Sequence, residues 1–505
     1  MKTSETNLPL NIGTASEFAR LRAAFKAAQF DEETVLSTLA IMDMSDIGTI
    51  DFAQVDFSRL PEQFEALVYL FLVLRPMPSS RLERLFEPET LEAFLSLGLL
   101  GTGDLGPSEY YAKVLLYPLK GFWIASDRYS NPDGSPFVAP PDIVFPAIYS
   151  GTLRFLKLLP LSDAEHGLDL CAGSGIGAFL LSRCSKRAVS SDLTERATHF
   201  AAFNRSLNDL TNVEVVRGDL FEPVAGQTFD RIVAHPPYVP SLTNARIWRD
   251  GGKTGEQLIR RIVSELRHYL RRGGIFCGFS LGLDTREGQF EERVRGWLED
   301  AGEKFDIIFA STDDTKTPSQ VLRTLAERED GIGPEEEKKL RAAFAEAGIV
   351  RMPKGALVIR RHGQADQHQA WTVRTKLSEV TEGSDFENTL ASHHLFSEES
   401  FVNTLLKARP VPAPRLEVKV THVVHEGELA PAQFVFEIDK PFNLSVLMDG
   451  WVVPLIARFD GKETPLDIYE QARASGDIPD GFQLNNFVTL LARMIERGFL
   501  IVPEA

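Results

Sequence analysis

The sequence of 505 residues has little cysteine, because only Cys171, Cys184 and Cys277 occur and their spacing fits no metal-binding pattern. This scarcity excludes a disulfide framework and favours a reducing, cytoplasmic compartment. Long apolar runs are also lacking: the longest, Phe64 to Leu74, is far short of the roughly 20 residues that a membrane-spanning helix needs. The start, MKTSETNLPLN, has neither the basic end nor the apolar core of a signal peptide, so we expect no membrane partner.

Basic charge is in deficit, with 54 Lys and Arg against 71 Asp and Glu and a net charge of −17. Such a surface repels phosphate backbones, which disfavours wholesale binding of nucleic acid but does not exclude a local basic patch. The basic runs Arg260-Arg261 and 267–272 are typical of the solvated face of a helix. The length predicts about three domains in a globular protein.

Both ends of the chain carry modules distinct from the middle. Residues 1–108 predict a helical, winged-helix-like domain, in which the acidic residues of the stretch 79–100 favour packing over DNA binding. Residues 109–146 predict a β-hairpin unit that leads into the next domain. Residues 449–505 again resemble a winged helix, of a kind that also occurs in peptide-recognition modules. The intervening residues 363–448 are predicted to be a linker and a β-rich segment.

Residues 147–362 alternate strand and helix, which predicts an α/β fold with a parallel, doubly wound sheet. The expected strands are 167–171, 187–192, 213–217, 230–235, 274–280, 305–310 and 355–361. A charged helical insertion, at about 316–348, is expected between the last two of these strands. Four histidines lie at or after the end of this domain, at 362, 368, 393 and 394. Their spacing suits no standard metal site, and we interpret them as solvated linker or surface, so no metal is predicted.

A glycine turn follows the first of these strands, in the stretch LDLCAGSGIG that spans 168–177. The chain must turn sharply there and approach a ligand closely, while the next helix offers free amide groups at its start. Asp192 ends the second strand, at the distance where an acidic residue holds a ribose diol in dinucleotide folds. Asp219 follows the third strand, and the motif His235-Pro-Pro-Tyr238 ends the fourth. All lie at strand carboxyl ends, where open α/β sheets bind ligands.

These motifs resemble those of class I S-adenosylmethionine-dependent methyltransferases, in the branch with an Asn/Asp/Ser-Pro-Pro-Tyr motif. That branch includes the glutamine methyltransferases of release factors and ribosomal proteins, and enzymes that methylate amino groups of RNA and DNA. The run DLTERATHFAAFNRSLN from Asp192 is similar to the family's second block, and RDGGKTG at 249–255 to the glycine-rich segment after the motif. The resemblance implies a Rossmann-like sheet of seven strands, and it covers 167–282. The wider layout is similar to that of larger bacterial members of uncharacterised substrate.

The resemblance also implies roles for individual residues. The cofactor, S-adenosylmethionine, would contact Asp169, Ala172, Gly173, Gly175, Gly177, Asp192, Leu193, Asp219, Leu220 and His235. Asp192 would hold the ribose hydroxyls, and Asp219 would face the adenine. The catalytic set would be His235, Pro236 and Tyr238, with Pro237, Tyr238, Trp248 and Arg249 against the substrate. In the family, the first motif residue and the first proline's carbonyl orient a planar nitrogen, and alignment of this kind can contribute about 7–11 kcal/mol.

The sequence departs from the pattern at its first motif position, where His235 replaces Asn, Asp or Ser. A neutral histidine accepts one hydrogen bond, so it can orient an acceptor. It can equally act as a general base, or have a structural role alone. Three functions stay open: N-methylation of a peptide or protein side chain or of a small metabolite, methylation of nucleic-acid amino groups, and a non-catalytic scaffold. The sequence determines neither the substrate nor the oligomeric state.

Overall fold

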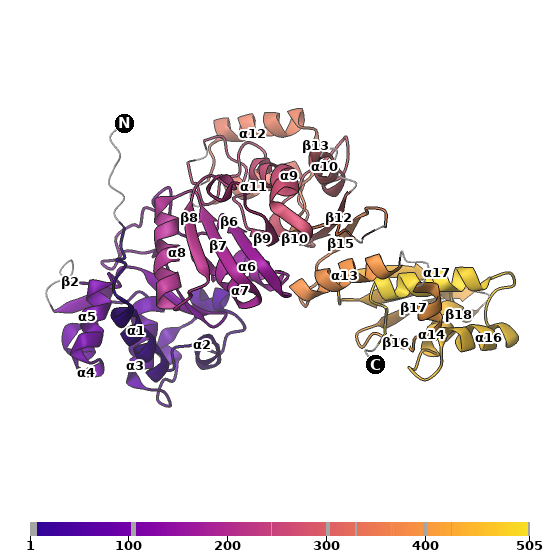
Figure 1. Cartoon of the computed structure of the whole chain (residues 1–505), viewed down its shortest axis with the longest axis horizontal. Coiled ribbons are helices and arrows are strands. Elements are labelled where there is room, and N and C mark those ends of the chain that lie inside the picture. The colour runs from indigo at the N-terminus through magenta and orange to yellow at the C-terminus, as the bar shows by residue number, and fades with distance from the viewer. Residues whose placement is uncertain are drawn as a thin grey trace. The chain divides into compact units, whose positions relative to one another are not determined.

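The computed structural model of the chain describes residues 8–102, 108–243, 245–298, 304–328, 331–364, 366, 368–396, 401–425 and 427–502. The chain divides into two compact units, the first formed by Met1–Leu156 with Asp163–Arg271 and the second by Lys157–Ser162 with Arg272–Ala505. Figure 1 shows the helices and strands of both. No helix within the described ranges combines the length and the apolar character that crossing a bilayer requires.

The first unit begins with a helical region. Its helices are α1 (Ala15–Ala27), α2 (Glu32–Leu39), α3 (Glu62–Leu67), α4 (Ser79–Leu85) and α5 (Pro88–Ser96), with short helical turns η1 (Met44–Thr49), η2 (Phe52–Gln54) and η3 (Val68–Leu72). Helix α1 starts at a capping box, in which the Thr14 hydroxyl and the Glu17 carboxylate each accept a hydrogen bond from the other residue's backbone N–H. The buried Phe18 ring of α1 meets the Phe203 ring edge to face at 5.2 Å. This contact anchors the helical region on the α/β part of the same unit.

Two small antiparallel sheets complete this region. Strands β1 (Met77–Pro78), β2 (Leu100–Thr102) and β3 (Glu109–Ala112) form a sheet of order β1-β3-β2. Strands β4 (Leu115–Leu119) and β5 (Phe122–Ser126) form a hairpin, in which Leu115 pairs with Ser126. Every residue of β4 is buried, as expected for a hairpin with both faces covered.

The α/β part of the first unit is a parallel arrangement of four strands. Its elements are α6 (Ser150–Lys157), β6 (Ala164–Leu170), α7 (Ile176–Cys184), β7 (Ser185–Asp192), α8 (Glu195–Leu207), β8 (Val213–Arg217), η4 (Glu222–Val224), β9 (Phe229–Ala234) and α9 (Gln257–Tyr269). The order is β9-β6-β7-β8, and every neighbouring pair is parallel. The strands lie within a few residues of the predicted ranges. Because parallel strands end at a common edge, the segments after β6, β7, β8 and β9 meet there.

The second unit contributes strands of mixed direction. Its first elements are β10 (Leu270–Leu281), β11 (Asp284–Thr285), α10 (Phe290–Trp297), β12 (Phe305–Ser311), α11 (Pro318–Ala326), α12 (Pro334–Glu346), β13 (Ile349–Arg351), β14 (Lys354–Arg361) and β15 (Thr372–Lys376). The order is β15-β12-β14-β10, with β14 antiparallel to both neighbours. The prediction of a wholly parallel sheet is therefore wrong here. The connection through α11 and α12 returns the chain to the edge where β12 ended, so β14 runs back along it.

An α/β Rossmann-like fold is nevertheless confirmed by this alternation of strands and helices. Strand β15, which runs parallel to β12, is an addition that the sequence analysis did not predict. Beyond it lie α13 (Gly383–Phe396), α14 (Phe401–Lys407), β16 (Val411–Pro412), β17 (Glu417–His425), β18 (Glu428–Ile438), β19 (Leu444–Met448), α15 (Val452–Ala457), α16 (Pro465–Ala474), α17 (Leu484–Glu496) and β20 (Leu500–Ile501). Strands β17, β18 and β19 form an antiparallel sheet, and Phe436, Ile468 and Phe487 are buried in one core with its helices.

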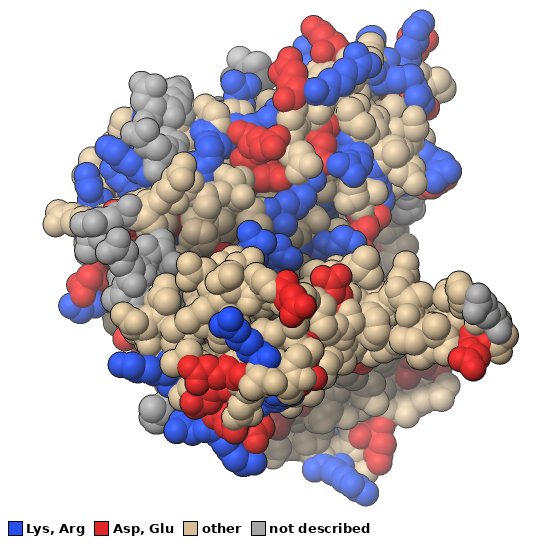
Figure 2. All heavy atoms as spheres, turned by 90° about the vertical axis from the view of Figure 1, so that its right-hand side faces the viewer, with Lys and Arg blue, Asp and Glu red and all other residues tan. Residues whose placement is uncertain are grey.

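Charged side chains of both signs share the surface. On the face drawn in Figure 2, Lys and Arg groups are scattered among Asp and Glu groups rather than gathered into one continuous basic stripe.

The prediction that the histidines are solvated is wrong for two of them. The His362 side chain is 10% exposed and that of His368 is 1% exposed. Both rings bind the buried carboxylate of Asp306 on β12, which lies far back in the sequence. His393 on α13 is half-buried, and the side chain of His394 lies outside the described set.

Candidate functional site

The glycine turn after β6 is built from backbone conformations that favour glycine. Gly173 has a φ of 53° and Gly175 a φ of 88°, and Gly175 is the N-cap of α7. A Cβ on Gly177 would lie 2.6 Å from Oδ2 of Asp169, so only glycine lets the helix approach the strand end this closely. A Cβ on Gly173 would meet nothing within 4 Å, so the turn faces open space at this residue.

Two carboxylates hold the turn through backbone amides. Asp169, at the end of β6, accepts a hydrogen bond from the Ala178 N–H of α7 at 2.9 Å. Asp192, the last residue of β7, accepts one from the Gly173 N–H at 3.0 Å and another from the Thr194 N–H at 3.0 Å. The turn, the start of α7 and the end of β7 are thus fastened into one structure. The exposed Leu193 follows directly.

Acidic side chains gather at this edge. Burial, and to a smaller extent the neighbouring Asp192, raise the pKa of Asp169 to about 8. Burial also raises the pKa of Asp192. The thiol of Cys171 has a raised pKa because it is buried and because the carboxylates of Asp192, Asp169 and Asp219 surround it. The acids that end three different strands therefore converge, as their strand positions predict.

Asp219 differs from the other two carboxylates because it is half-exposed. Its Oδ2 lies 2.8 Å from Nη2 of Arg261 on α9. The Ser191 hydroxyl donates a hydrogen bond to the carbonyl of the next residue, Leu220, at 3.3 Å, which ties this segment to β7. Asp219 thus lies at the same edge of the sheet. A ligand that binds its carboxylate must either displace Arg261 or share the carboxylate with it.

One positioning residue of the turn is absent from the predicted site. Asn204 of α8 is fully buried, and its Nδ2 donates to the carbonyl oxygens of Ser174 at 3.0 Å and Ala125 at 2.9 Å. Its Oδ1 accepts from the Ala125 N–H at 2.8 Å. The amide therefore joins the glycine turn to the hairpin strand β5. Asn204 stands within the run that resembles the family's second block, and that position was the available signal.

The His235 ring packs against two aromatic rings. It follows β9 directly, and its ring lies 5.1 Å from that of Phe155 on α6 and 5.9 Å from that of Tyr238, with the planes 30° and 28° apart. Pro236 is buried, while Pro237 and Tyr238 are partly exposed. The plane of the imidazole is therefore fixed at the carboxyl end of β9. Phe155 was missed because nothing in the sequence links α6 to the motif.

The segment 249–251 is hydrogen-bonded to the residue that follows the motif, Val239. The Val239 N–H donates to the Arg249 carbonyl at 2.9 Å, and the Gly251 N–H donates to the Val239 carbonyl at 2.8 Å. A Cβ on Gly251 would lie 2.7 Å from Cα of Tyr238, so glycine is needed for this approach. The Arg249 guanidinium is paired with the carboxylate of Asp250 at 3.1 Å and is mostly buried, which is a bracing arrangement.

Trp248 takes part in an aromatic stack. Its ring lies 4.6 Å from that of Phe145, with the planes 7° apart, and Phe145 in turn stacks on Tyr149 at 4.2 Å. Phe145 is 37% exposed and Tyr149 43% exposed, so the stack reaches the surface. Trp248 and Arg249 are thus neighbours in sequence with different surroundings, one in a stack and one in an ion pair.

The chemistry of this edge fits S-adenosylmethionine. The cofactor carries a sulfonium, a ribose diol and an adenine, and three carboxylates converge at the edge. The open space at Gly173 lets a ligand reach backbone amides, and the start of α7 favours a negative group such as the cofactor's carboxylate. The residues present therefore match the group that the sequence motifs predict.

Known proteins agree with this reading. A family model described as a methyltransferase small domain matches residues 146–278. A putative protein N5-glutamine methyltransferase of Methanocaldococcus jannaschii is 32% identical over 142 residues, which are 27% of this chain and 70% of that protein. A ribosomal protein uL3 glutamine methyltransferase of Bradyrhizobium diazoefficiens is 31% identical over 207 residues, 36% of this chain and 65% of that protein.

A third relative is a release factor glutamine methyltransferase of Thermodesulfovibrio yellowstonii, 31% identical over 135 residues, or 24% of this chain and 47% of that protein. This chain thus spans 65% of the uL3 enzyme and 47% of the release factor enzyme. With the glycine turn, the strand-end acids and the Pro-Pro-Tyr motif in place, the matches identify the α/β part. The chain belongs to the class I S-adenosylmethionine-dependent methyltransferases and resembles the protein glutamine methyltransferases among them.

Proposed function

We propose that this protein transfers a methyl group from S-adenosylmethionine to a side-chain nitrogen of a protein substrate. The observation that carries the proposal is the juxtaposition of a glycine turn with the His235-Pro-Pro-Tyr238 motif at one edge of parallel strands. The names of the relatives support a protein substrate, because they describe methylation of glutamine in a release factor or ribosomal protein. The acidic net charge of −17 argues against a nucleic acid.

In this proposal, the strand-end residues hold the cofactor, which supplies an electrophilic methyl group on a sulfonium. Asp169 and the turn of Ala172, Gly173, Gly175 and Gly177 face its methionine part. Asp192 takes the ribose hydroxyls with its remaining lone pairs, next to Leu193. Asp219 and Leu220 face the adenine, and the Asp219–Arg261 pair at 2.8 Å opens or is shared on binding.

The proposed role of His235 is to orient the acceptor nitrogen. Its ring plane is fixed by packing against Phe155 and Tyr238, which suits presentation of one acceptor atom at a constant angle. The Pro236 carbonyl is the second acceptor, and Tyr238 with Pro237 contacts the flat face of the substrate group. Alignment of this kind is an effective source of rate, since it replaces a chance encounter with a fixed geometry.

The flanking regions are proposed to recognise or enclose the substrate. Residues 1–108 and 449–505 are the modules predicted to be winged-helix-like, with 109–146 and 363–448 as connecting segments and 147–362 as the catalytic domain. Two aspects of the structure support these assignments. Helices α4 and α5 are followed by strand β2 of the small antiparallel sheet β1-β3-β2. Strands β17, β18 and β19 are followed by helices α15, α16 and α17, which share one apolar core with the sheet. Trp248 and the Phe145 stack are proposed as the aromatic part of the substrate contact.

Label transfer tests the proposed function. The full chain is incubated with S-adenosylmethionine that carries a tritiated methyl group and with a cell lysate, and the labelled products are then digested. We expect label that protease releases and nuclease does not. Label that only nuclease releases would replace the protein substrate by a nucleic acid. Undetectable cofactor binding in calorimetry would leave a scaffold.

Two variants of His235 test its role. His235→Ala is expected to lower turnover about 10²–10³-fold, the usual effect of removing one preorganised polar group. Cofactor affinity should stay within about threefold, since the turn is untouched. His235→Asn, which accepts a hydrogen bond but takes no proton, should recover most of the turnover. If Asn is as inactive as Ala, His235 is a general base, and loss of cofactor binding in His235→Ala contradicts the role altogether.

A further inference from the structure

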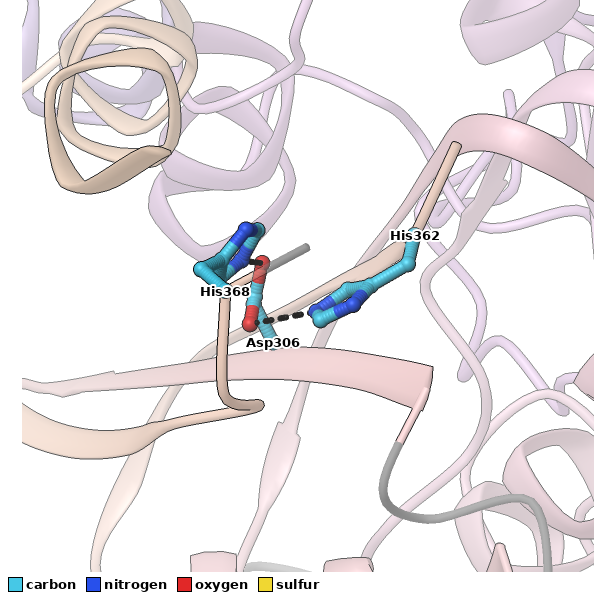
Figure 3. Close-up of side chains that lie close together, drawn as sticks. All are labelled: Asp306, His362 and His368. Atoms are coloured by element: carbon cyan, nitrogen blue, oxygen red, sulfur yellow. Dashed lines mark hydrogen bonds and ion pairs between the residues drawn. The ribbon is translucent and has the colours of Figure 1, made fainter. Parts of the chain in front are cut away.

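A carboxylate and two imidazoles converge in the second unit. Asp306 is the second residue of β12, His362 follows β14 directly, and His368 lies on the connection from β14 to β15. Nε2 of His362 is 2.9 Å from Oδ1 of Asp306, and Nε2 of His368 is 2.9 Å from Oδ2. Figure 3 shows the carboxylate between the two rings, each of which faces a different oxygen. One ligand atom of each residue lies within 4.8 Å of the others.

This group is buried as well as close. Asp306 is fully buried, and the His362 and His368 side chains are 10% and 1% exposed. A carboxylate only accepts hydrogen bonds, so both Nε2 atoms donate protons to it when they are hydrogen-bonded in this way. Without those protons, the two Nε2 atoms carry lone pairs beside the two oxygens of one carboxylate, and the ligand atoms of the three residues lie within 4.8 Å of one another. Two imidazoles with one carboxylate are a donor set typical of divalent transition metals.

A third imidazole lies beside the group. The His393 ring of α13 is 5.9 Å from that of His368 and stacks on Trp371 at 4.2 Å. Its Nδ1 is buried and has no hydrogen-bond partner among the described residues. His393 therefore packs beside the group, while the atoms that lie within 4.8 Å of one another belong to Asp306, His362 and His368.

The neighbouring positive charge is balanced. Arg360, on β14, lies 3.8 Å from Oδ2 of Asp306 through Nη1. Its Nη2 is 2.8 Å from the carboxylate of Asp366, which offsets the guanidinium. The Trp371 N–H donates to Oδ1 of Asp306 at 3.3 Å, so the orientation of the carboxylate is also fixed by the backbone. Such hydrogen bonds around a ligand are the usual support of a metal site.

We propose that Asp306, His362 and His368 bind one divalent transition-metal ion, of the class of Zn²⁺. The ligands are Nε2 of each histidine and a carboxylate oxygen of Asp306, with a fourth position for water. The ion fastens His362 and His368 to β12 and so stabilises the second unit. Methyl transfer itself needs no metal, so this site is separate from the proposed function.

Zinc titration of the full chain tests the site. The protein is treated with a chelator, dialysed and titrated with ZnCl₂ in competition with a chromophoric chelator. About one equivalent should bind with sub-micromolar affinity, as at three-ligand zinc sites, and thermal unfolding should shift to higher temperature. His368→Ala and His362→Ala should each lose at least tenfold in affinity. The matched controls are His422→Ala and His425→Ala, which remove exposed histidines of β17 and should bind zinc as the wild type does.

Cobalt binding to the wild-type protein tests the site without any variant, so the test holds even where a variant folds poorly. Co²⁺ bound to the wild-type protein in this donor set should give visible d–d absorption that Zn²⁺ abolishes by displacement. The proposal is overturned if the zinc affinity of the wild-type protein is no higher than that of free histidine. It is equally overturned if a folded double variant of His362 and His368 retains the wild-type affinity. In either outcome the three residues form a hydrogen-bonded cluster alone, and the methyltransferase assay is unaffected.

Discussion

Two aspartates of this chain are held by several hydrogen bonds, but their donors are of different kinds. Asp192 accepts from the backbone N–H groups of Gly173 and Thr194, whereas Asp306 accepts mainly from the imidazoles of His362 and His368. A backbone amide is a permanent donor, so Asp192 keeps one orientation and offers its remaining lone pairs to a ligand. An imidazole can give up its proton and become a metal ligand. The first arrangement suits a cofactor's hydroxyls, and the second suits a cation.

Loss of the Asp306 carboxylate gives the largest expected effect of this comparison. Asp306→Ala leaves two buried imidazoles without their acceptor, and such losses typically cost about 3–5 kcal/mol. We expect this decrease in the free energy of unfolding of the second unit, measured by urea denaturation without added metal. Asp306→Asn, which retains one acceptor oxygen, should lose less. A change as small as that of an ordinary surface mutation would show that the cluster contributes no stability.

Loss of the Asp192 carboxylate should act on binding instead. Hydrogen bonds to a charged group are worth about 1.5–3 kcal/mol, so Asp192→Ala should raise the Kd for S-adenosylmethionine roughly 10–100-fold. Calorimetry measures this value. The control is Asp163→Ala, which removes an exposed carboxylate from the same unit. If the two variants bind the cofactor equally well, Asp192 does not hold it.

The effect expected at Asp169 is absent at low pH and grows as the pH rises. Burial raises the pKa of this carboxyl from 3.8 to about 8, so the folded state binds its proton more tightly than the unfolded state does. The resulting stabilisation is fully present below about pH 4 and is lost as the pH rises through about 8. Asp169→Asn stays neutral at every pH. The variant should therefore become progressively more stable than the wild type over this range, by up to a few kcal/mol at pH 8 and above.

That difference is read from thermal or urea unfolding of both proteins at several pH values without cofactor. A constant difference from pH 4 to 9 would mean that Asp169 titrates normally despite its burial. The two asparagine variants should also change stability in opposite directions. Asp306→Asn should lower the free energy of unfolding, whereas Asp169→Asn should raise it at high pH.

The sequence predicted the glycine turn and the strand ends well because their rules are local. Positive φ angles demand glycine at 173 and 175, and the strand β6 at Ala164–Leu170 lies close to the predicted 167–171. The convergence of Asp192 and Asp219 followed from parallel strands alone. Nothing beyond periodicity and turn chemistry was needed.

The parts that were missed depend on contacts between distant segments. His362 and His368 meet a carboxylate 56 and 62 positions away, and no spacing rule in a single chain signals such a pair. The contact between Phe155 and His235 was missed for the same reason, because the two residues are distant in the sequence. The antiparallel β14 was missed because alternating strands and helices imply a parallel sheet by default, and only the course of α11 and α12 reverses it.

The contrast between Gly173 and Gly177 has a consequence for engineering this enzyme. At Gly177 a single methyl group would collide with Asp169, whereas the space beside Gly173 is open. Cofactor analogues with bulkier transferable groups need room, and directed evolution can seek it around Gly173 and on the side of the turn facing it. Libraries that randomise position 177 should yield mostly inactive clones. The packing of helix α7 against the Asp169 carboxylate thus restricts substitution at position 177.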